Sequence, residues 1–146
     1  MTPLQFAVPI GALESFSGAF PYVILALVLV SLVTRHLAYS HYKQSARDGA
    51  DALERYTPHY AVSAVLVLAC LLYMVIEPHS GMVVSVLVIG TFVADMFEFE
   101  SRNVEARNNL DIDRPNGAIT VSVLAVLYAA YLALFWVIRE QWTAIV

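Results

Sequence analysis

Long apolar runs dominate the pattern of hydrophobic and polar positions along the chain, and shorter polar stretches separate them. A helix needs about 20 apolar residues to cross the hydrocarbon core of a bilayer, which is roughly 30 Å thick. The runs that approach this length predict four membrane-spanning helices, over residues 20–38, 58–76, 81–97 and 117–138. The polar stretches 39–57 and 98–116 then connect the spans on one side. The pattern predicts a single all-α domain, an integral membrane four-helix bundle.

The first 20 residues form a different kind of segment. Their apolar positions are interrupted by Pro3, Pro9 and Gly11, and they contain no Lys or Arg, so the basic start of a cleavable secretory signal is missing. We expect this segment to lie at the membrane interface, and the first span to act as an uncleaved anchor. Its apolar positions are Leu4, Phe6, Val8, Ile10 and Leu13.

Composition points to lipid as the solvent of this chain. Hydrophobic residues make up 60% and charged residues 14% of the 146 positions. An ordinary soluble domain is about half apolar and a quarter charged. The excess apolar surface needs lipid to cover it, which supports the four predicted spans.

The distribution of cations predicts the orientation. Seven of the eight Lys and Arg residues lie at or in the connections 39–57 and 98–116, and the remaining one, Arg139, follows the last span. Cytoplasmic loops are enriched in Lys and Arg. We therefore expect a multi-pass protein of the cell membrane with these two loops in the cytoplasm and both termini on the extracytoplasmic side. The seven cations are Arg35, Lys43, Arg47, Arg55, Arg102, Arg107 and Arg114.

Small residues recur at helical spacing in two spans. Such residues let helix backbones approach closely inside a membrane. Two interpretations stay open: packing within the bundle, or docking to the helix of a partner. The candidate interface residues are Gly90 and Ala94 in the third span and Ala125, Ala129 and Ala133 in the fourth.

Asp95 is the acid that first suggests function, because ionisable residues within a span are costly and often functional. Helical spacing relates it to Glu98 and Arg102, and relates Arg102 to Glu105. We expect the third helix to continue into the cytoplasm with a ladder of ion pairs in which Arg102 lies beside Asp95. Asp95 is then structural; the alternative is a proton or cation path through it.

Signatures of a cofactor or an enzyme are missing from the sequence. The chain has no Glu-x-x-His pair, nucleophile elbow, phosphate-binding Gly loop or His-Glu-x-x-His motif. A haem would need axial ligands such as His36 and His59 on facing helices. We expect no enzymatic activity, no catalytic residue, no cofactor and no metal. The residues considered for a carboxylate–histidine metal site are His36, His41, His59, Glu98, Glu100 and Glu105.

The two charged loops carry acidic as well as basic residues, so the sequence predicts no nucleic-acid surface. In the first loop, residues 40–56 have an amphipathic pattern that favours a helix suited to docking. Its apolar positions are Tyr42, Ala46, Ala50 and Leu53.

Five short motifs give the chain a family resemblance: Arg55-Tyr-Thr-Pro-His, Gly81-Met-Val-x-Ser-Val-Leu-Val, Phe97-Glu-Phe-Glu, Val104-Glu-Ala-Arg-Asn and Arg114-Pro-x-Gly-Ala-Ile. With these motifs, the chain resembles a family of small four-helix membrane proteins from halophilic archaea to which no activity is assigned. The chain contains one Lys and twelve Asp and Glu residues, and few lysines with many carboxylates fit a protein that works in high salt. The resemblance implies association with cytochrome bc-type respiratory complexes, beside a cytochrome b and a Rieske protein, and it supplies no catalytic residues.

The sequence thus predicts a non-catalytic accessory, or supernumerary, subunit of a larger membrane complex, with a respiratory cytochrome bc-type complex as the candidate. Its expected partners are other integral membrane subunits and membrane lipids. Two alternatives remain open. One is a small oligomeric transporter or channel that uses Asp95. The other is a redox membrane protein that binds haem or quinone.

Overall fold

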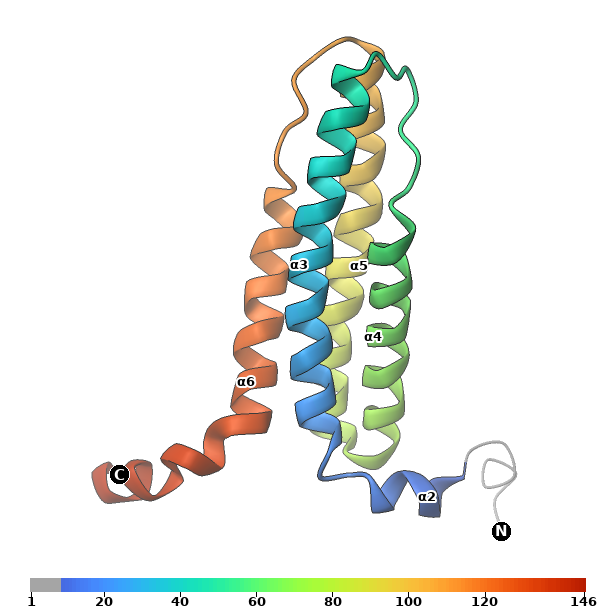
Figure 1. The fold of residues 1–146 in the computed structure, drawn as a ribbon. Coiled ribbons are helices and arrows are strands. Elements are labelled where there is room, and N and C mark those ends of the chain that lie inside the picture. Colours follow the sequence, from blue (N-terminus) through green and yellow to red (C-terminus); the bar gives the residue numbers. More distant parts are fainter. Residues whose placement is uncertain (1–8) are drawn as a thin grey trace.

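The computed structural model describes residues 9–146, and over this range helices are its only regular secondary structure (Figure 1). The expected all-α fold is confirmed. The helices are α2 (Ile10–Ser15), α3 (Phe20–Arg47), α4 (Thr57–Ile76), α5 (Pro78–Arg107) and α6 (Asn116–Ile145).

The four long helices form an antiparallel bundle in which each packs against two neighbours. Helix α3 contacts α4 and α6, and α5 also contacts α4 and α6. All four are long and apolar enough to cross a membrane, and each contains one of the predicted spans. Large apolar side chains, such as Val33, Val86 and Leu127, are exposed on the outside of the bundle. These properties suggest a multi-pass membrane protein.

Two helices continue well beyond the apolar runs. Helix α5 reaches Arg107, as predicted, and α3 reaches Arg47, so much of each polar connection is helical. Helix α3 ends where Gly49 adopts a left-handed backbone (φ 89°) and the amide of Ala50 donates to the carbonyl of Ser45. The prediction of a separate amphipathic helix over 40–56 is wrong. Its first half belongs to α3, and its second half is a non-helical linker.

Two of the four apolar residues that suggested the amphipathic pattern are nevertheless buried. Tyr42 and Leu53 lie in a small hydrophobic cluster at this end of the bundle. The amide of Tyr56 donates to the Tyr42 hydroxyl (3.1 Å), and the amide of Leu53 donates to the Asn103 side chain (2.7 Å). The remaining members of the cluster are Ala38, Phe99, Ala106 and Ile112.

At the opposite end, α4 and α5 meet in a tight hairpin through Glu77 and Pro78. Gly81 lies directly against the backbone of Met74, and a Cβ at position 81 would overlap it. The hairpin therefore requires glycine at this position.

The small-residue stripe of α6 lies inside the chain's own bundle. Ala125 and Ala129 belong to the main hydrophobic core, and Ala133 is also buried. On α5, Gly90 and Ala94 are half-buried, and Gly90 faces Val121 of α6. The alanines of α6 therefore pack within the bundle, which is the first of the two interpretations.

Helix α2 and the last turns of α6 lie at the same end of the bundle, and both run across its axis (Figure 1). Trp136 donates from Nε1 to the Tyr22 hydroxyl (2.8 Å), where α6 leaves the bundle. Residues 136–146 are all exposed. Of the predicted interfacial segment, Ile10 and Leu13 lie in α2, whereas Leu4, Phe6 and Val8 lie outside the described residues.

Candidate functional site: a buried polar network shared by four helices

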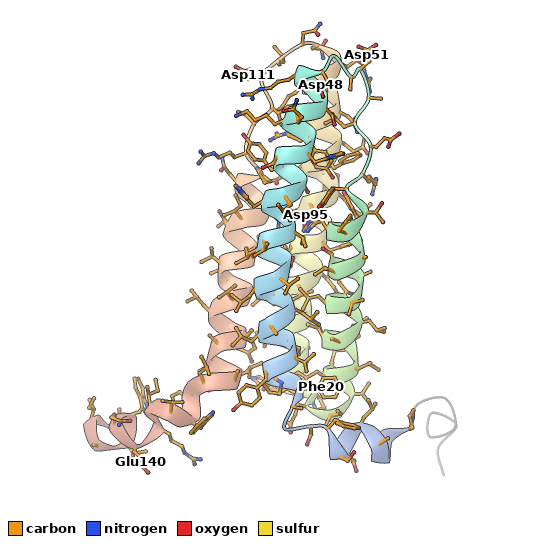
Figure 2. All side chains as sticks on the ribbon, in the orientation of Figure 1. Phe20, Asp48, Asp51, Asp95, Asp111 and Glu140 are labelled. Atoms are coloured by element: carbon orange, nitrogen blue, oxygen red, sulfur yellow. The ribbon has the colours of Figure 1, made fainter. Side chains whose placement is uncertain are left out.

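Asp95 lies inside the bundle, part-way between the end that carries Asp48, Asp51 and Asp111 and the end that carries Phe20 and Glu140 (Figure 2). Its side chain is only 8% exposed, and its partner is Arg35 of α3, which is 5% exposed. Arg35 Nε donates to Oδ1 (2.9 Å) and Nη2 donates to Oδ2 (2.7 Å). This two-pronged geometry is the strongest form of a guanidinium–carboxylate pair.

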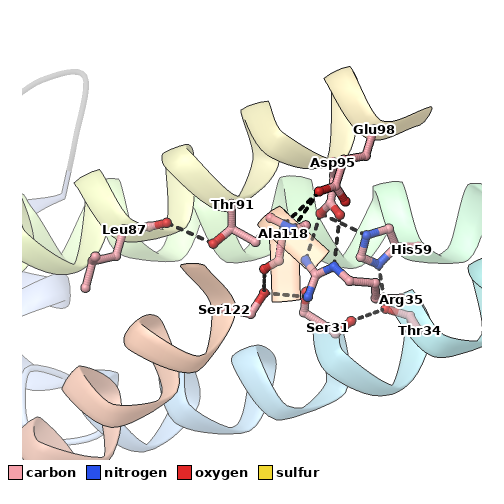
Figure 3. A network of polar contacts seen from close by, with 11 residues as sticks. Ser31, Thr34, Arg35, His59, Leu87, Thr91, Asp95, Glu98, Ala118 and Ser122 are labelled. Carbon is pink, nitrogen blue, oxygen red and sulfur yellow. Dashed lines mark hydrogen bonds and ion pairs between the residues drawn. The ribbon is translucent and has the colours of Figure 1, made fainter. Parts of the chain in front are cut away.

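His59 of α4 completes the surroundings of the carboxylate (Figure 3). Its Nε2 is 3.0 Å from Asp95 Oδ2, and its Nδ1 is 2.9 Å from the Thr34 hydroxyl of α3. The ring is buried, with 4% of its side chain exposed. Both ring nitrogens are therefore within hydrogen-bond distance of an oxygen.

Ser122 brings the fourth helix into the network. Arg35 Nη1 donates to Ser122 Oγ (2.5 Å), and the Ser122 hydroxyl donates to the carbonyl of Ala118 one turn earlier in α6 (2.5 Å). Each long helix thus contributes to the network: Thr34 and Arg35 from α3, His59 from α4, Asp95 from α5 and Ser122 from α6. The network links every helix of the bundle around one buried ion pair.

The prediction that Arg102 lies beside Asp95 is wrong. Local helical spacing suggested it, but Asp95 faces the bundle interior, whereas Arg102 lies at the end of the bundle, against the 108–115 linker. The sequence held one usable signal for the true partner. Arg35 and Asp95 are isolated opposite charges, each within a few residues of the same predicted membrane boundary.

Arg102 instead holds the linker that leads into α6. Its Nη1 donates to the carbonyls of Asp113 and Arg114. Its Nε lies 2.9 Å from Glu105 Oε2, which confirms the ion pair predicted between these residues, although the N–H does not point at that oxygen. Glu105 Oε2 accepts from the amide of Asp113 (3.0 Å).

Glu98 caps the start of α6. Its Oε1 accepts hydrogen bonds from the backbone amides of Gly117 (2.8 Å) and Ala118 (3.1 Å), which no carbonyl within the helix can satisfy. A Cβ at position 117 would come within 2.7 Å of Oε1. Helical spacing groups Asp95, Glu98 and Arg102, but each has a different role. Asp95 pairs with Arg35, Glu98 caps α6 and Arg102 holds the linker.

Two small cavities lie beside Asp95 and Ser122. A cavity of about 30 Å³ lies on the side toward the charged loops, lined by Arg35, Tyr42, His59 and Asp95 among others. A second cavity of about 10 Å³ lies on the other side, where Ser31, Ser63, Thr91 and Ser122 contribute hydroxyls. Volumes of this size hold one or a few water molecules.

The residues considered for a metal or haem site do not come together. His36 and His41 are exposed, whereas His59 is buried in the network. Within residues 9–146, no three His, Cys, Asp or Glu side chains are placed to hold a metal ion. An axial ligand needs a free nitrogen lone pair, and both nitrogens of His59 already face oxygens.

Comparisons with known proteins assign the chain to a sequence family. Searches of curated proteins and of solved structures found no match. The family model that describes a domain of unknown function, DUF7313, matches residues 2–146. This match covers nearly the entire length, and the chain therefore belongs to the DUF7313 family.

Proposed function

We propose that this chain is a non-catalytic accessory subunit of a larger membrane complex. In this proposal the four long helices cross the cell membrane, the loops rich in Arg lie in the cytoplasm, and both termini lie outside. The observation that carries the proposal is the network around Asp95, which engages polar groups from all four helices with one another.

A site that binds or transforms a substrate needs polar groups that are free to meet it. Here Arg35 donates three N–H groups, two to Asp95 and one to Ser122. Each ring nitrogen of His59 lies within hydrogen-bond distance of an oxygen, from Asp95 or from Thr34. The cavity that Asp95 and His59 line is about 30 Å³, far below the 300–1,000 Å³ typical of ligand sites. These features favour a role in fixing how the helices pack.

The outside of the bundle is the surface available to partner subunits. It carries large exposed apolar side chains, including Phe97, which is 72% exposed, and Val86 on the same helix. A respiratory cytochrome bc-type complex, with its cytochrome b and Rieske protein, is the candidate assembly. The sequence resemblance supports this choice of complex, and the exposed apolar surface supports a membrane-embedded partner of any kind.

A small oligomeric transporter or channel is the second candidate. The observation that favours it is a buried acid in contact with a histidine, with a small cavity on each side of the network. Carboxylates and histidines form proton relays in membrane proteins. In this candidate, Asp95 would carry the proton.

Purification of the tagged chain from its native membrane in a mild detergent tests the main proposal. We expect other integral membrane proteins to co-purify in fixed ratio, and native mass spectrometry to give one defined assembly. A chain that elutes alone, or only with copies of itself, would contradict the proposal of an accessory subunit.

Reconstitution into vesicles tests the second candidate. With a pH-sensitive dye inside the vesicles, an accessory subunit should give no proton flux above that of empty vesicles. A channel should give flux that Asp95→Asn abolishes and that Glu100→Gln, a neutralised acid on the exposed surface, leaves unchanged.

A further inference from the structure

A groove separates α3 from the start of α6 on the outside of the bundle. Its volume is about 260 Å³, much larger than that of the cavities beside the network. Leu32, Arg35, His36 and Tyr39 line it from α3, and Arg114, Pro115 and Ile119 line it from the other side. It lies where the apolar run of α3 gives way to the charged end of the bundle.

The polar part of the groove contains one exposed cation, Arg114, and the imidazole of His36. Arg114 and His36 are both exposed, and the structure gives the Arg114 side chain no ion pair with any residue of the range 9–146. Among the residues that the structure describes, no carboxylate lines the groove. Asp95 binds Arg35 and Glu98 caps α6, and the exposed Asp113, which precedes Arg114 in the sequence, does not line the groove. The start of α6 is thus closed to an anion by Glu98, and Arg114 remains available.

The other part of the groove is apolar. Leu32 and Ile119 form opposite walls, and Ile119 is 38% exposed at the outer surface. Its neighbours on the two helices, including Val33 and Val123, are exposed apolar side chains that continue along the bundle. A ligand that fits this groove therefore has an anionic head and an apolar tail.

We propose that this groove binds one anionic phospholipid, with the phosphate diester between Arg114 and His36 and the acyl or alkyl chain along Leu32 and Ile119. Guanidinium groups bind phosphate oxygens through paired hydrogen bonds. Basic sites between membrane helices at this depth suit lipid headgroups. The proposal does not depend on whether the chain is a subunit or a channel.

Native mass spectrometry of the purified full chain, delipidated in an uncharged detergent, tests the site. Phosphatidylglycerol is the anionic probe and phosphatidylcholine is the zwitterionic control. We expect one phosphatidylglycerol to bind in preference to phosphatidylcholine. Arg114→Gln should weaken its binding about fivefold or more, as expected for one cation at the headgroup level.

Arg107→Gln is the matched control, because Arg107 is an exposed cation at the same end of the bundle but outside the groove. It should leave the affinity unchanged. Equal losses in Arg107→Gln and Arg114→Gln would mean diffuse attraction to a positive end and would overturn the proposal.

Ile119→Trp separates a lipid from a free anion. The larger side chain fills the apolar part of the groove and leaves Arg114 and His36 in place, so it should displace phosphatidylglycerol. If lipid binding survives in this variant, or if millimolar inorganic phosphate competes fully with the lipid, the site recognises a phosphate group alone and the proposal is wrong.

Discussion

At the residue scale, the ion pair between Arg35 and Asp95 is the costliest element of the structure. Taking two charges out of water costs several kcal/mol per ion, which only good geometry and further hydrogen bonds can offset. Both Asp95 oxygens accept from Arg35, and one also meets His59. The two buried charges are therefore compatible with a stable fold only while these hydrogen bonds are all made.

Asp95→Asn should therefore be strongly destabilising, because it leaves the Arg35 charge buried without a counter-ion. We expect a loss of about 3–5 kcal/mol in the free energy of unfolding, measured by titration of the detergent-solubilised protein with a denaturing detergent. The double variant Arg35→Gln, Asp95→Asn removes both charges and should recover part of this loss.

The exposed pair of Arg55 and Glu100 provides the control, with side chains 45% and 67% exposed and a distance of 3.6 Å. Glu100→Gln should cost less than about 1 kcal/mol. A double variant no more stable than Asp95→Asn alone would show that Arg35 and Asp95 are not energetically coupled.

At Gly81, whether a substitution by alanine stabilises or destabilises the protein tests the close contact of α4 and α5. Glycine to alanine in a helix interior ordinarily stabilises by about 0.5–1 kcal/mol. At position 81 the added Cβ would overlap the Met74 backbone, so Gly81→Ala should destabilise by about 1–3 kcal/mol instead. Thermal unfolding followed by circular dichroism measures the change in stability.

Gly18→Ala is the comparison, because nothing lies within 4 Å of a Cβ there. It should leave the midpoint of unfolding nearly unchanged. If Gly81→Ala raises the midpoint, α4 and α5 are not in the close contact described.

At the element scale, the packing of α6 depends on a row of small side chains. Ala118, Ser122, Ala125, Ala129 and Ala133 are all buried and recur at intervals of three or four residues. Because they are small, α6 can approach α3 and α5 closely enough for Ser122 to reach Arg35. The stripe and the polar network therefore depend on each other.

Ala129→Leu adds three carbons at a position with no exposed surface. Overpacking of this kind costs about 1–3 kcal/mol. We expect a lower midpoint of thermal unfolding in detergent, and faster degradation in the cell.

Ala64→Leu, on the exposed face of α4, should be neutral, since lipid accommodates either side chain. A fully stable Ala129→Leu protein that no longer joins its complex would instead mean that the stripe faces a partner.

At the scale of the whole molecule, the orientation in the membrane is open to a direct test. In a Cys70→Ala background, which removes the free thiol, single cysteines replace Asp51 and His79 at opposite ends of the bundle. With an impermeant thiol reagent on intact cells, His79→Cys should be labelled. Asp51→Cys should react only after permeabilisation. The reverse pattern would overturn the proposed orientation.

Features that depend on contiguous residues could be predicted from the sequence. The number and approximate position of the long helices follow from the length of the apolar runs, and the continuation of α5 to Arg107 follows from helical spacing. The pair of Arg102 and Glu105 was also predictable, because a separation of three residues on one helix nearly fixes their distance.

Contacts between residues on different helices could not be predicted from the sequence and became known from the fold. Arg35 and Asp95 are 60 positions apart, and their contact depends on how α3 and α5 are rotated about their own axes. Helical periodicity places Ala129 on a face of α6, but it does not say which neighbour that face meets. The same holds for the groove of Arg114 and His36, whose walls come from segments far apart in the sequence. Local spacing fixes distances within one helix, whereas contacts between helices depend on the combined packing of all four.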